Sequence, residues 1–286
     1  MSDSRPKLVH TVAQLRKSLD VVRADGRSIG FVPTMGALHE GHLSLVRASK
    51  MQCDYTVVSI FVNPSQFGPG EDLDSYPRTL ESDLDVLAKC EAELVFAPVG
   101  KDVYGPEHAT WVEVGSVAAP LDGRSRPQHF RGVATIVLKL LNMAGADVAF
   151  FGQKDYQQAM VIRRMVEDLD VPTEICVCPT VREPDGLAMS SRNAYLSPQA
   201  RRQSLVLWKS LQLARQLVEQ RERSAEVIVR RMRAVIATAE DARIDYVALV
   251  DPGSLQPVDE VSSATLAALA VNIDNTRLID NCILEP

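Results

Sequence analysis

The sequence predicts an α/β protein in which a larger domain, built on a parallel sheet, precedes a smaller α+β domain. Short apolar runs alternate with helical patterns over residues 28–181, which is typical of βαβ units whose sheet is buried on both faces. The pattern then changes to a long helical region at roughly 198–240, followed by further apolar runs. A length of 286 residues also favours one large domain plus a small one.

Five strands of the parallel sheet are predicted in order along the chain. They cover residues 28–33, 55–62, 92–98, 147–152 and 173–181. Helical patterns separate them, and the helix over 156–168 is an example. There Val161, Met165 and Leu169 recur every four residues, so we expect this stripe to lie on the sheet.

The smaller domain is expected to begin where the alternation stops. Pro184, Asp185 and Gly186 form a turn signal, so we predict a domain of residues 1–183 followed by one of residues 184–286. After the helical region, the runs DYVALVDP, ATLAALAVNI and TRLIDNCIL are predicted strands. A hinge or lid role for this domain is a hypothesis from composition.

Composition and charge exclude several classes of protein. A formal net charge of −6 and a pI near 5.5 argue against a general nucleic-acid binder. The N-terminal residues lack the layout of a signal peptide, and the longest apolar run is too short to span a bilayer, so we expect a cytoplasmic protein with no membrane partner. Five cysteines without a CxxC pair argue against a disulfide framework or a zinc knot.

Polar clusters follow four of the predicted strands. These clusters are HEGH (39–42), NPSQF (63–67), GQKDYQQ (152–158) and VREPDGLAMSSRN (181–193). Ligands of open α/β sheets bind outside the carboxyl ends of the strands. We therefore expect the four clusters to describe one crevice.

His39 and His42 suit an anion site. If the helix begins near Gly41, the two histidines lie about one turn apart beside free backbone N–H groups and the positive end of the helix dipole. Gly41 and Gly36 allow close approach and a loose turn. Zinc would need further ligands that the motif lacks, and a purely structural role stays open.

The other clusters add cations and neutral amides. Lys154 can neutralise phosphate and Arg192 offers a fixed fork of donors, although Asp155 could simply cap a solvated helix. The neutral amides, which can hold a carboxylate or a hydroxyl, are Asn63, Gln66, Gln157 and Gln158. With no Ser-His-Asp order and no cysteine beside a histidine, this inventory favours transfer at phosphorus by positioning and charge stabilisation.

Five motifs in this order and spacing strongly resemble the pantothenate synthetase family, ATP-dependent ligases that join pantoate to β-alanine. They are PTMGALHEGH, SIFVNPSQFGPGEDLDSYPRT, HFRGVATIV, FFGQKDYQQ and VREPDGLAMSSRN, within residues 28–197. The resemblance implies a Rossmann-like domain, a small C-terminal lid domain and a homodimer. It also implies pantothenate biosynthesis in the coenzyme A pathway, through a pantoyl adenylate with release of AMP and pyrophosphate.

The resemblance also implies the site residues. Residues of three segments and one further position would bind ATP: Met35, Gly36, Ala37, Leu38, His39, Glu40, Gly41 and His42; Gly152, Gln153, Lys154 and Asp155; Val181; and Met189, Ser190, Ser191 and Arg192. His42 would be the proton donor and His39 would lie beside the phosphates, with Lys154 and Arg192 completing the catalytic set.

The acid-binding residues and the metal follow from the same resemblance. Gln66 would hold D-pantoate and later β-alanine, Gln158 and Asn63 would contact pantoate, and Arg126 with HFRGV would border that pocket. Asp83 would bind the Mg²⁺ of Mg-ATP, although an exposed acidic helix start is an equal reading. Gln153 stands where the family usually has Glu, which would shift affinity modestly.

Two rival functions remain open. Another adenylyl- or cytidylyltransferase of the HxGH superfamily would need more Lys and Arg near Asn63 and Gln66, where the sequence has neutral amides. A non-catalytic nucleotide-binding or RNA-contacting module is disfavoured by the acidic pI and by the complete HEGH, GQKD and MSSR set.

Overall fold

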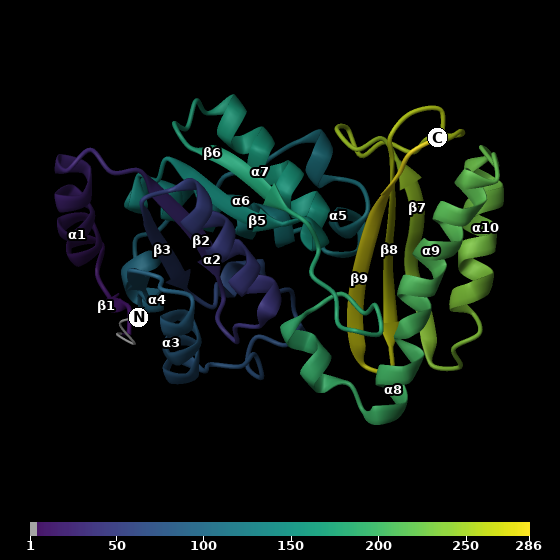
Figure 1. The fold of residues 1–286 in the computed structure, drawn as a ribbon, viewed down its shortest axis with the longest axis horizontal. Coiled ribbons are helices and arrows are strands. Elements are labelled where there is room, and N and C mark those ends of the chain that lie inside the picture. Colours follow the sequence, from purple (N-terminus) through teal and green to yellow (C-terminus); the bar gives the residue numbers. More distant parts are fainter. Residues whose placement is uncertain (1–4) are drawn as a thin grey trace. The chain divides into compact units, whose positions relative to one another are not determined.

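The computed structural model describes residues 5–286 (Figure 1). Residues 1–4 lie outside the described residues, and so does the part of the signal-peptide prediction that falls on them. The chain forms two compact units: unit 1 comprises the residues through Val114, Gln128–Gly152 and Val161–Pro179, and unit 2 comprises Gly115–Pro127, Gln153–Met160 and Thr180–Pro286. The predicted boundary between residues 183 and 184 stays a prediction.

Unit 1 is built on a six-stranded parallel sheet with the order β1-β4-β3-β2-β5-β6. The strands are β1 (Lys7–Val9), β2 (Ile29–Thr34), β3 (Tyr55–Ile60), β4 (Leu94–Phe96), β5 (Val148–Gly152) and β6 (Glu174–Cys178). From β2 the chain moves outward to β3 and β4, and then returns to the other side of β2 for β5 and β6. The order therefore reverses between β2 and β5, which is where α/β sheets bind ligands.

Helices cover both faces of this sheet. They are α1 (Val12–Ala24), α2 (Glu40–Gln52), α3 (Leu80–Lys89), α4 (Gly100–Val103), α6 (His129–Ala144) and α7 (Tyr156–Asp168). Phe31 and Val32 point to opposite faces of β2, and both are fully buried. The expected double burial of the sheet, and with it the predicted α/β class, is confirmed.

Several local expectations are corrected. The sheet has a sixth strand, β1, and a helix, α1, at the N-terminal end that were not predicted, and most predicted strands are longer than the observed ones. Helix α7 has the predicted bounds, but Leu169 lies beyond its end and is 52% exposed, whereas Val161 and Met165 are buried. Hydrophobic spacing continued past the point where the helix ends.

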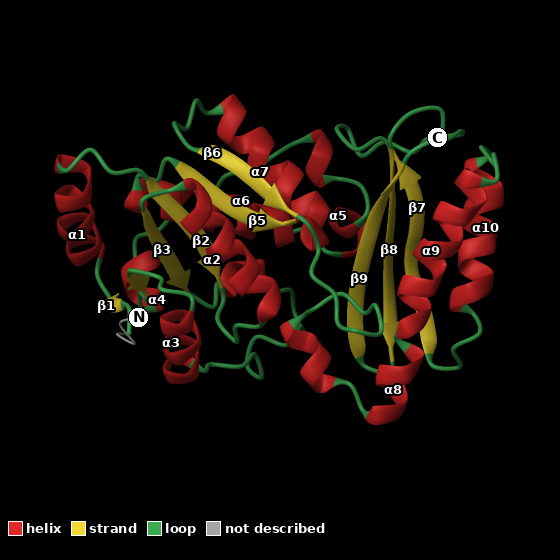
Figure 2. Ribbon diagram, viewed as in Figure 1, coloured by secondary structure: helices red, strands yellow, loops and turns green. Residues whose placement is uncertain are grey.

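Unit 2 contains a three-stranded antiparallel sheet (Figure 2). Its elements are η2 (Ser116–Ala118), α5 (Asp122–Ser125), η3 (Gln153–Asp155), η4 (Ser191–Tyr195), α8 (Pro198–Gln203), α9 (Leu205–Glu219), α10 (Ala225–Ile236), β7 (Ala242–Val250), β8 (Thr265–Ile273) and β9 (Thr276–Leu284). Helices α9 and α10 pack on one face, where Ala267 and Leu269 of β8 join their core. The predicted smaller α+β part is confirmed.

In residues 5–286, the structure has no helix that combines the length and the apolar character needed to cross a membrane.

Candidate active site

The loop between β2 and α2 places both histidines at the start of α2. His39 is the N-cap residue with extended backbone angles, and its Nδ1 accepts a hydrogen bond from the Gly41 N–H at 3.1 Å. The His42 Nδ1 accepts from the His39 N–H at 3.3 Å, and the ring centroids are 4.1 Å apart. The helix therefore begins at Glu40, one residue before the predicted start, and the two imidazoles form a reciprocal cap.

This cap defines the tautomer of both imidazoles. A nitrogen that accepts a backbone N–H cannot carry the proton of a neutral ring, so that proton lies on Nε2. The tautomer is assigned from the hydrogen-bond pattern. In its neutral form each ring therefore carries its proton on Nε2, and an Nε2–H is the kind of group that can donate to a phosphate oxygen.

The N–H groups at the start of α2 are not free as predicted, because that of Gly41 donates to His39 Nδ1 and those of His42 and Leu43 donate to the His39 carbonyl oxygen. The loop before the helix also uses its N–H groups. The Gly36 N–H donates to Thr34 Oγ1 at 3.2 Å, and those of Ala37 and Leu38 donate to the two carboxylate oxygens of Asp83 at 3.1 and 2.8 Å. These N–H groups form hydrogen bonds within the protein, and these bonds hold the loop in a tight turn. The groups that remain as candidates to hold an anion at this place are the imidazoles and the positive end of the α2 dipole.

Asp83 holds an unusual stretch of backbone. Gly36 and Ala37 have φ values of +84° and +52°, a region that L residues rarely adopt. The carboxylate of Asp83 also accepts from Thr79 Oγ1 at 3.2 Å and is only 2% exposed. Its observed partners give Asp83 a supporting role for the loop.

The Asp83 environment bears on the predicted magnesium site. Within residues 5–286, no three His, Cys, Asp or Glu side chains gather as a set of metal ligands. The donor set does not fit a magnesium site built by the protein alone. Magnesium binding by Asp83 stays a prediction.

In unit 1, Asn63 and Gln66 lie close to the loop that precedes the two histidines. Asn63 caps η1 (Pro64–Gln66), and its Nδ2 donates to Gln66 Oε1 at 3.0 Å. The Gln66 Nε2 in turn lies 3.1 Å from Met35 Sδ. The structure therefore brings the predicted pantoate-contacting amides to the first residue of the predicted ATP loop.

Helix α6 and Tyr104 support these amides. The HFRGV motif, which begins α6, was expected to border this pocket, whereas the contact of Tyr104 was not predicted. The Tyr104 hydroxyl donates to Asn63 Oδ1 at 2.9 Å, and burial raises the pKa of Tyr104. His129 Nδ1 lies 2.9 Å from the Gln66 carbonyl oxygen. A Cβ on Gly132 would lie 2.2 Å from the Ser65 carbonyl oxygen, so glycine allows α6 to approach η1.

Lys154 lies in the η3 turn of unit 2, just before α7. Its ammonium is 3.5 Å from Asp155 Oδ1, and the side chain is 19% exposed. The Asn281 Nδ2 donates to the carbonyl oxygens of Gln153 and Lys154 at 3.0 and 2.9 Å. The replaced position, Gln153, thus contributes a backbone oxygen to a strand contact.

The neighbouring glutamines have different environments. Gln157 is 4% exposed, donates to the Val117 and Pro120 carbonyl oxygens and accepts from the Asp122 N–H. Its amide is therefore a structural link, which corrects the expectation that it could hold a substrate. Gln158 is half-buried.

Arg126 lies near the end of the unit 2 segment 115–127. Arg126 follows α5, its N–H donates to the Asp122 carbonyl oxygen at 2.8 Å, and its side chain is half-buried. Asp122 itself is anchored by Arg277 of β9 at 2.5 Å. The ion pair of Asp122 with Arg277 therefore fixes the backbone position of Arg126. The contact of the Arg126 side chain with a substrate stays a prediction.

The segment of unit 2 from Val181 to Arg192, which carries predicted ATP residues, is a short hairpin followed by η4. The Met189 N–H donates to the Val181 carbonyl oxygen at 3.0 Å, which pairs two of the predicted ATP residues. Gly186 has φ +97° and lies against Trp208, so the turn requires glycine. Ser190 caps η4 by accepting from the Arg192 N–H at 3.3 Å.

The contacts of Asp280 and Asn281 were not predicted, because the run TRLIDNCIL was predicted only as a strand. Both residues are buried, at 2% and 4% exposure. The available signal was a pair of polar residues within an apolar strand, because buried polar side chains need partners.

Comparison with known proteins identifies relatives along almost the whole chain. The sequence model of the family described as Pantoate-beta-alanine ligase matches residues 7–283. A pantothenate synthetase of Moorella thermoacetica is 51% identical over 279 residues, covering 98% of this chain and 99% of that protein.

Solved structures give the same result. The crystal structure of pantothenate synthetase from Thermus thermophilus matches with a TM-score of 0.94 at 42% identity, covering 98% of this chain and 100% of that one. The pantoate-beta-alanine ligase of Francisella tularensis, crystallised with beta-gamma ATP and beta-alanine, matches with a TM-score of 0.81 at 34% identity, covering 97% of each chain. The chain therefore belongs to the pantoate–β-alanine ligase family.

Proposed function

We propose that this chain catalyses the ATP-dependent condensation of D-pantoate with β-alanine, forming the amide bond of pantothenate. The observation that carries this proposal is the family match over residues 7–283. The reciprocal His39–His42 cap at the start of α2 supports it, because it presents donors suited to phosphate at the ligand-binding edge of the sheet.

In the first step, a pantoate carboxylate oxygen attacks the α-phosphorus of ATP. The bond from that phosphorus to the bridging oxygen breaks, and pantoyl adenylate and pyrophosphate form. His42, His39, Lys154 and Arg192 are the groups we assign to the negative charge that builds on the phosphates. The other residues of the predicted ATP segments orient the nucleotide, since positioning supplies much of the rate in such transfers.

In the second step, the β-alanine amine attacks the pantoyl carbonyl carbon. The bond to the AMP oxygen breaks, the nitrogen loses a proton, and AMP leaves with the electron pair. We assign Gln66, Gln158 and Arg126 to the two acids. Asn63, which was predicted to contact pantoate, is 1% exposed and donates to Gln66 and to the Gly132 carbonyl oxygen, so we assign it to holding Gln66. The hydrogen bond from Asn63 to Gln66 supports the assignment, because it fixes the amide face that a hydroxyl or carboxylate would meet.

Magnesium enters this proposal as part of the ATP substrate. Mg²⁺ is commonly bound by phosphate oxygens and waters with few protein ligands. No step is assigned to a protein-held ion, and Asp83 is assigned to the loop that precedes α2.

The proposal includes a cytoplasmic homodimer. Both properties follow from the family resemblance. Light scattering at micromolar concentration tests the dimer, and a mass equal to 31.4 kDa, that of one chain, would refute it.

The function is tested by measuring AMP, pyrophosphate and pantothenate with Mg-ATP, D-pantoate and β-alanine. We expect pantothenate and AMP to appear together only when both acids are present. Pyrophosphate release that requires a phosphorylated acceptor would favour an adenylyl- or cytidylyltransferase of the same superfamily. Nucleotide binding without turnover of any of these substrates would favour a non-catalytic module.

A further inference from the structure

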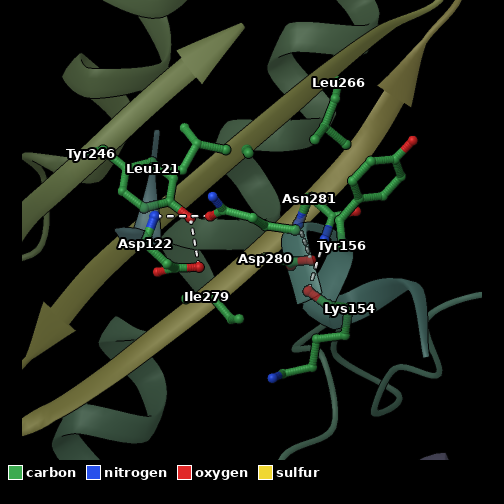
Figure 3. Close-up of a pocket in the computed structure, with 11 residues that line it drawn as sticks. Leu121, Asp122, Lys154, Tyr156, Tyr246, Leu266, Ile279, Asp280 and Asn281 are labelled. Atoms are coloured by element: carbon green, nitrogen blue, oxygen red, sulfur yellow. Dashed lines mark hydrogen bonds between the residues drawn. The ribbon is translucent and has the colours of Figure 1, made fainter. Parts of the chain in front are cut away.

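Asn281 of β9 holds the backbone of the turn that carries Lys154 (Figure 3). Its Nδ2 donates to the carbonyl oxygens of Gln153 and Lys154 at 3.0 and 2.9 Å, and Asn281 is 4% exposed. Figure 3 shows the Lys154 side chain extending away from these bonds. The contact therefore fixes the backbone of the turn. It does not constrain the rotamer of the Lys154 side chain.

The preceding residue, Asp280, holds a second segment. Its carboxylate accepts from Arg182 Nη1 and Nη2 at 2.7 and 2.9 Å, and its side chain is 1% exposed. The Arg182 guanidinium lies 3.8 Å from the Trp208 ring centroid and donates to the Gly186 carbonyl oxygen at 3.0 Å. This bidentate pair fixes the start of the hairpin that leads to Arg192.

The two contacts lie on opposite faces of β9. Successive side chains of a strand alternate, and the register pairs Asp280 with Leu269 but Asn281 with Ala268. Leu269 belongs to the core under the helices, whereas Ala268 lines a small cavity with Lys154. Two consecutive residues of β9 therefore support the hairpin on one face and the η3 turn on the other.

The cavity beside Asn281 is too small to be the nucleotide site. Its volume of about 20 Å³ has room for about one water molecule. Asn281 Oδ1 has no hydrogen-bond partner among residues 5–286, so the amide acts on the turn through its NH₂ group. These observations favour a supporting role over direct ligand binding.

We propose that Asn281 and Asp280 are positioning residues for the adenylate-forming step: Asn281 sets the place of Lys154, and Asp280, through Arg182, sets the place of the loop that carries Arg192. This inference rests on the proposed function, which assigns Lys154 and Arg192 to the ATP phosphates. A misplacement of about 1 Å at a reacting group lowers rates by roughly 100-fold, so a distant backbone contact can matter.

The first test is Asn281→Asp, which keeps the shape of the side chain. It replaces the NH₂ donor with a carboxylate oxygen that faces two carbonyl oxygens, so the turn is pushed away. We expect kcat for pantoate-dependent pyrophosphate release to fall roughly 10- to 100-fold, with the KM for β-alanine unchanged. Asn275→Asp, at the exposed β8–β9 turn, is the matched control and should keep wild-type kinetics.

A double-mutant cycle separates positioning from general damage. If Asn281 acts through Lys154, Asn281→Asp lowers the rate of the Lys154→Ala variant no further. A full multiplicative decrease in that background would overturn the proposal. Asn281→Ala replaces Asn281→Asp in the cycle if the charged variant does not fold.

The Asp280 arm is tested by the same cycle with Asp280→Asn and Arg192→Ala. Non-additive decreases support the inference, and independent ones overturn this arm.

A failure of the proposed function is recognised separately. If wild-type protein forms no pantothenate, both cycles are repeated as the affinity for α,β-methylene-ATP by calorimetry. Non-additive losses of affinity then support positioning, and additive losses overturn it.

Discussion

The loop before α2 in unit 1 and the η3 turn in unit 2 are held in opposite ways. In the first, the Asp83 carboxylate accepts hydrogen bonds from the N–H groups of Ala37 and Leu38. In the second, the Asn281 amide donates hydrogen bonds to the carbonyl oxygens of Gln153 and Lys154. The acceptor removes backbone donors that would suit a phosphate. A glycine-rich turn before a helix suggests that backbone N–H groups bind the anion. Because Asp83 occupies two of these groups, we propose that the donors for an anion at the α2 loop are mainly side chains.

The largest expected effect comes from removing these side chains. His42→Ala and Lys154→Ala should each lower kcat by roughly 10²–10³, because each deletes a group that stabilises developing charge. The melting temperature should stay near that of the wild type for Lys154→Ala and fall slightly for His42→Ala, which also loses the capping hydrogen bond from the His39 N–H. Lys89→Ala, at an exposed position of α3, is the control. Near-normal turnover in both site variants would break the comparison, since the side chains would then be dispensable.

The acceptor support is tested by Asp83→Asn. The change replaces one carboxylate oxygen with an NH₂ group that faces a backbone N–H, and hydrogen bonds to a charged group contribute about 1.5–3 kcal/mol. We expect a loss of that size in the free energy of unfolding and a weaker affinity for ATP. Asp85→Asn, on the exposed side of α3, should change stability by less than about 1 kcal/mol. Unchanged stability and unchanged ATP affinity for Asp83→Asn would remove its supporting role.

A close backbone approach is the third kind of support, and Gly132→Ala tests it. The new Cβ would lie 2.2 Å from the Ser65 carbonyl oxygen and 2.7 Å from the Gln66 nitrogen. Relief of such a clash typically costs about 1–3 kcal/mol, and the shift of η1 should raise the KM for pantoate. Gly105→Ala, which meets nothing within 4 Å, is the control. A stable variant with unchanged KM would show that η1 moves without consequence.

The smallest expected effect is that of an exposed ion pair in unit 2. The hydrogen bond from Arg201 lowers the pKa of Asp185 below its usual range. Because the folded state binds the proton less well, the contribution is present above the unfolded pKa and is lost as the pH falls below about 4. Arg201→Gln should lower the melting temperature slightly at pH 7 and by less at pH 3, with less than about 1 kcal/mol involved. An equal decrease at both pH values would refute this.

Local pattern was enough to predict most of the fold. The strands at the centre of the sheet are continuous apolar runs, and the position of α7 along the chain follows from its hydrophobic stripe. Strand β1 was missed because its three residues, Lys7–Val9, carry little pattern and form through pairing with β4. Leu169 shows the converse failure, since the spacing of apolar residues does not state where a helix stops.

The candidate site was predictable where chemistry and turn signals coincide, as at His39 and His42. The supports were not, because their partners lie far apart in the sequence. Asp83 reaches a loop some 45 residues away, with no feature of the TLESDLD segment to indicate its target. Gln157 and Gln158 are adjacent amides, and only three-dimensional packing reveals that the first is a structural link.

The contacts of β9 have a consequence for the time course of folding. Asn281 and Lys154 are 127 residues apart, and Arg182 and Asp280 are 98 apart. Such non-local contacts form late, because closing a long loop is entropically unfavourable until the whole strand pairs. During refolding, the secondary structure of both units should return before the capacity to bind nucleotide does. The chain should thus become competent only after β9 has made these contacts with the η3 turn and with Arg182.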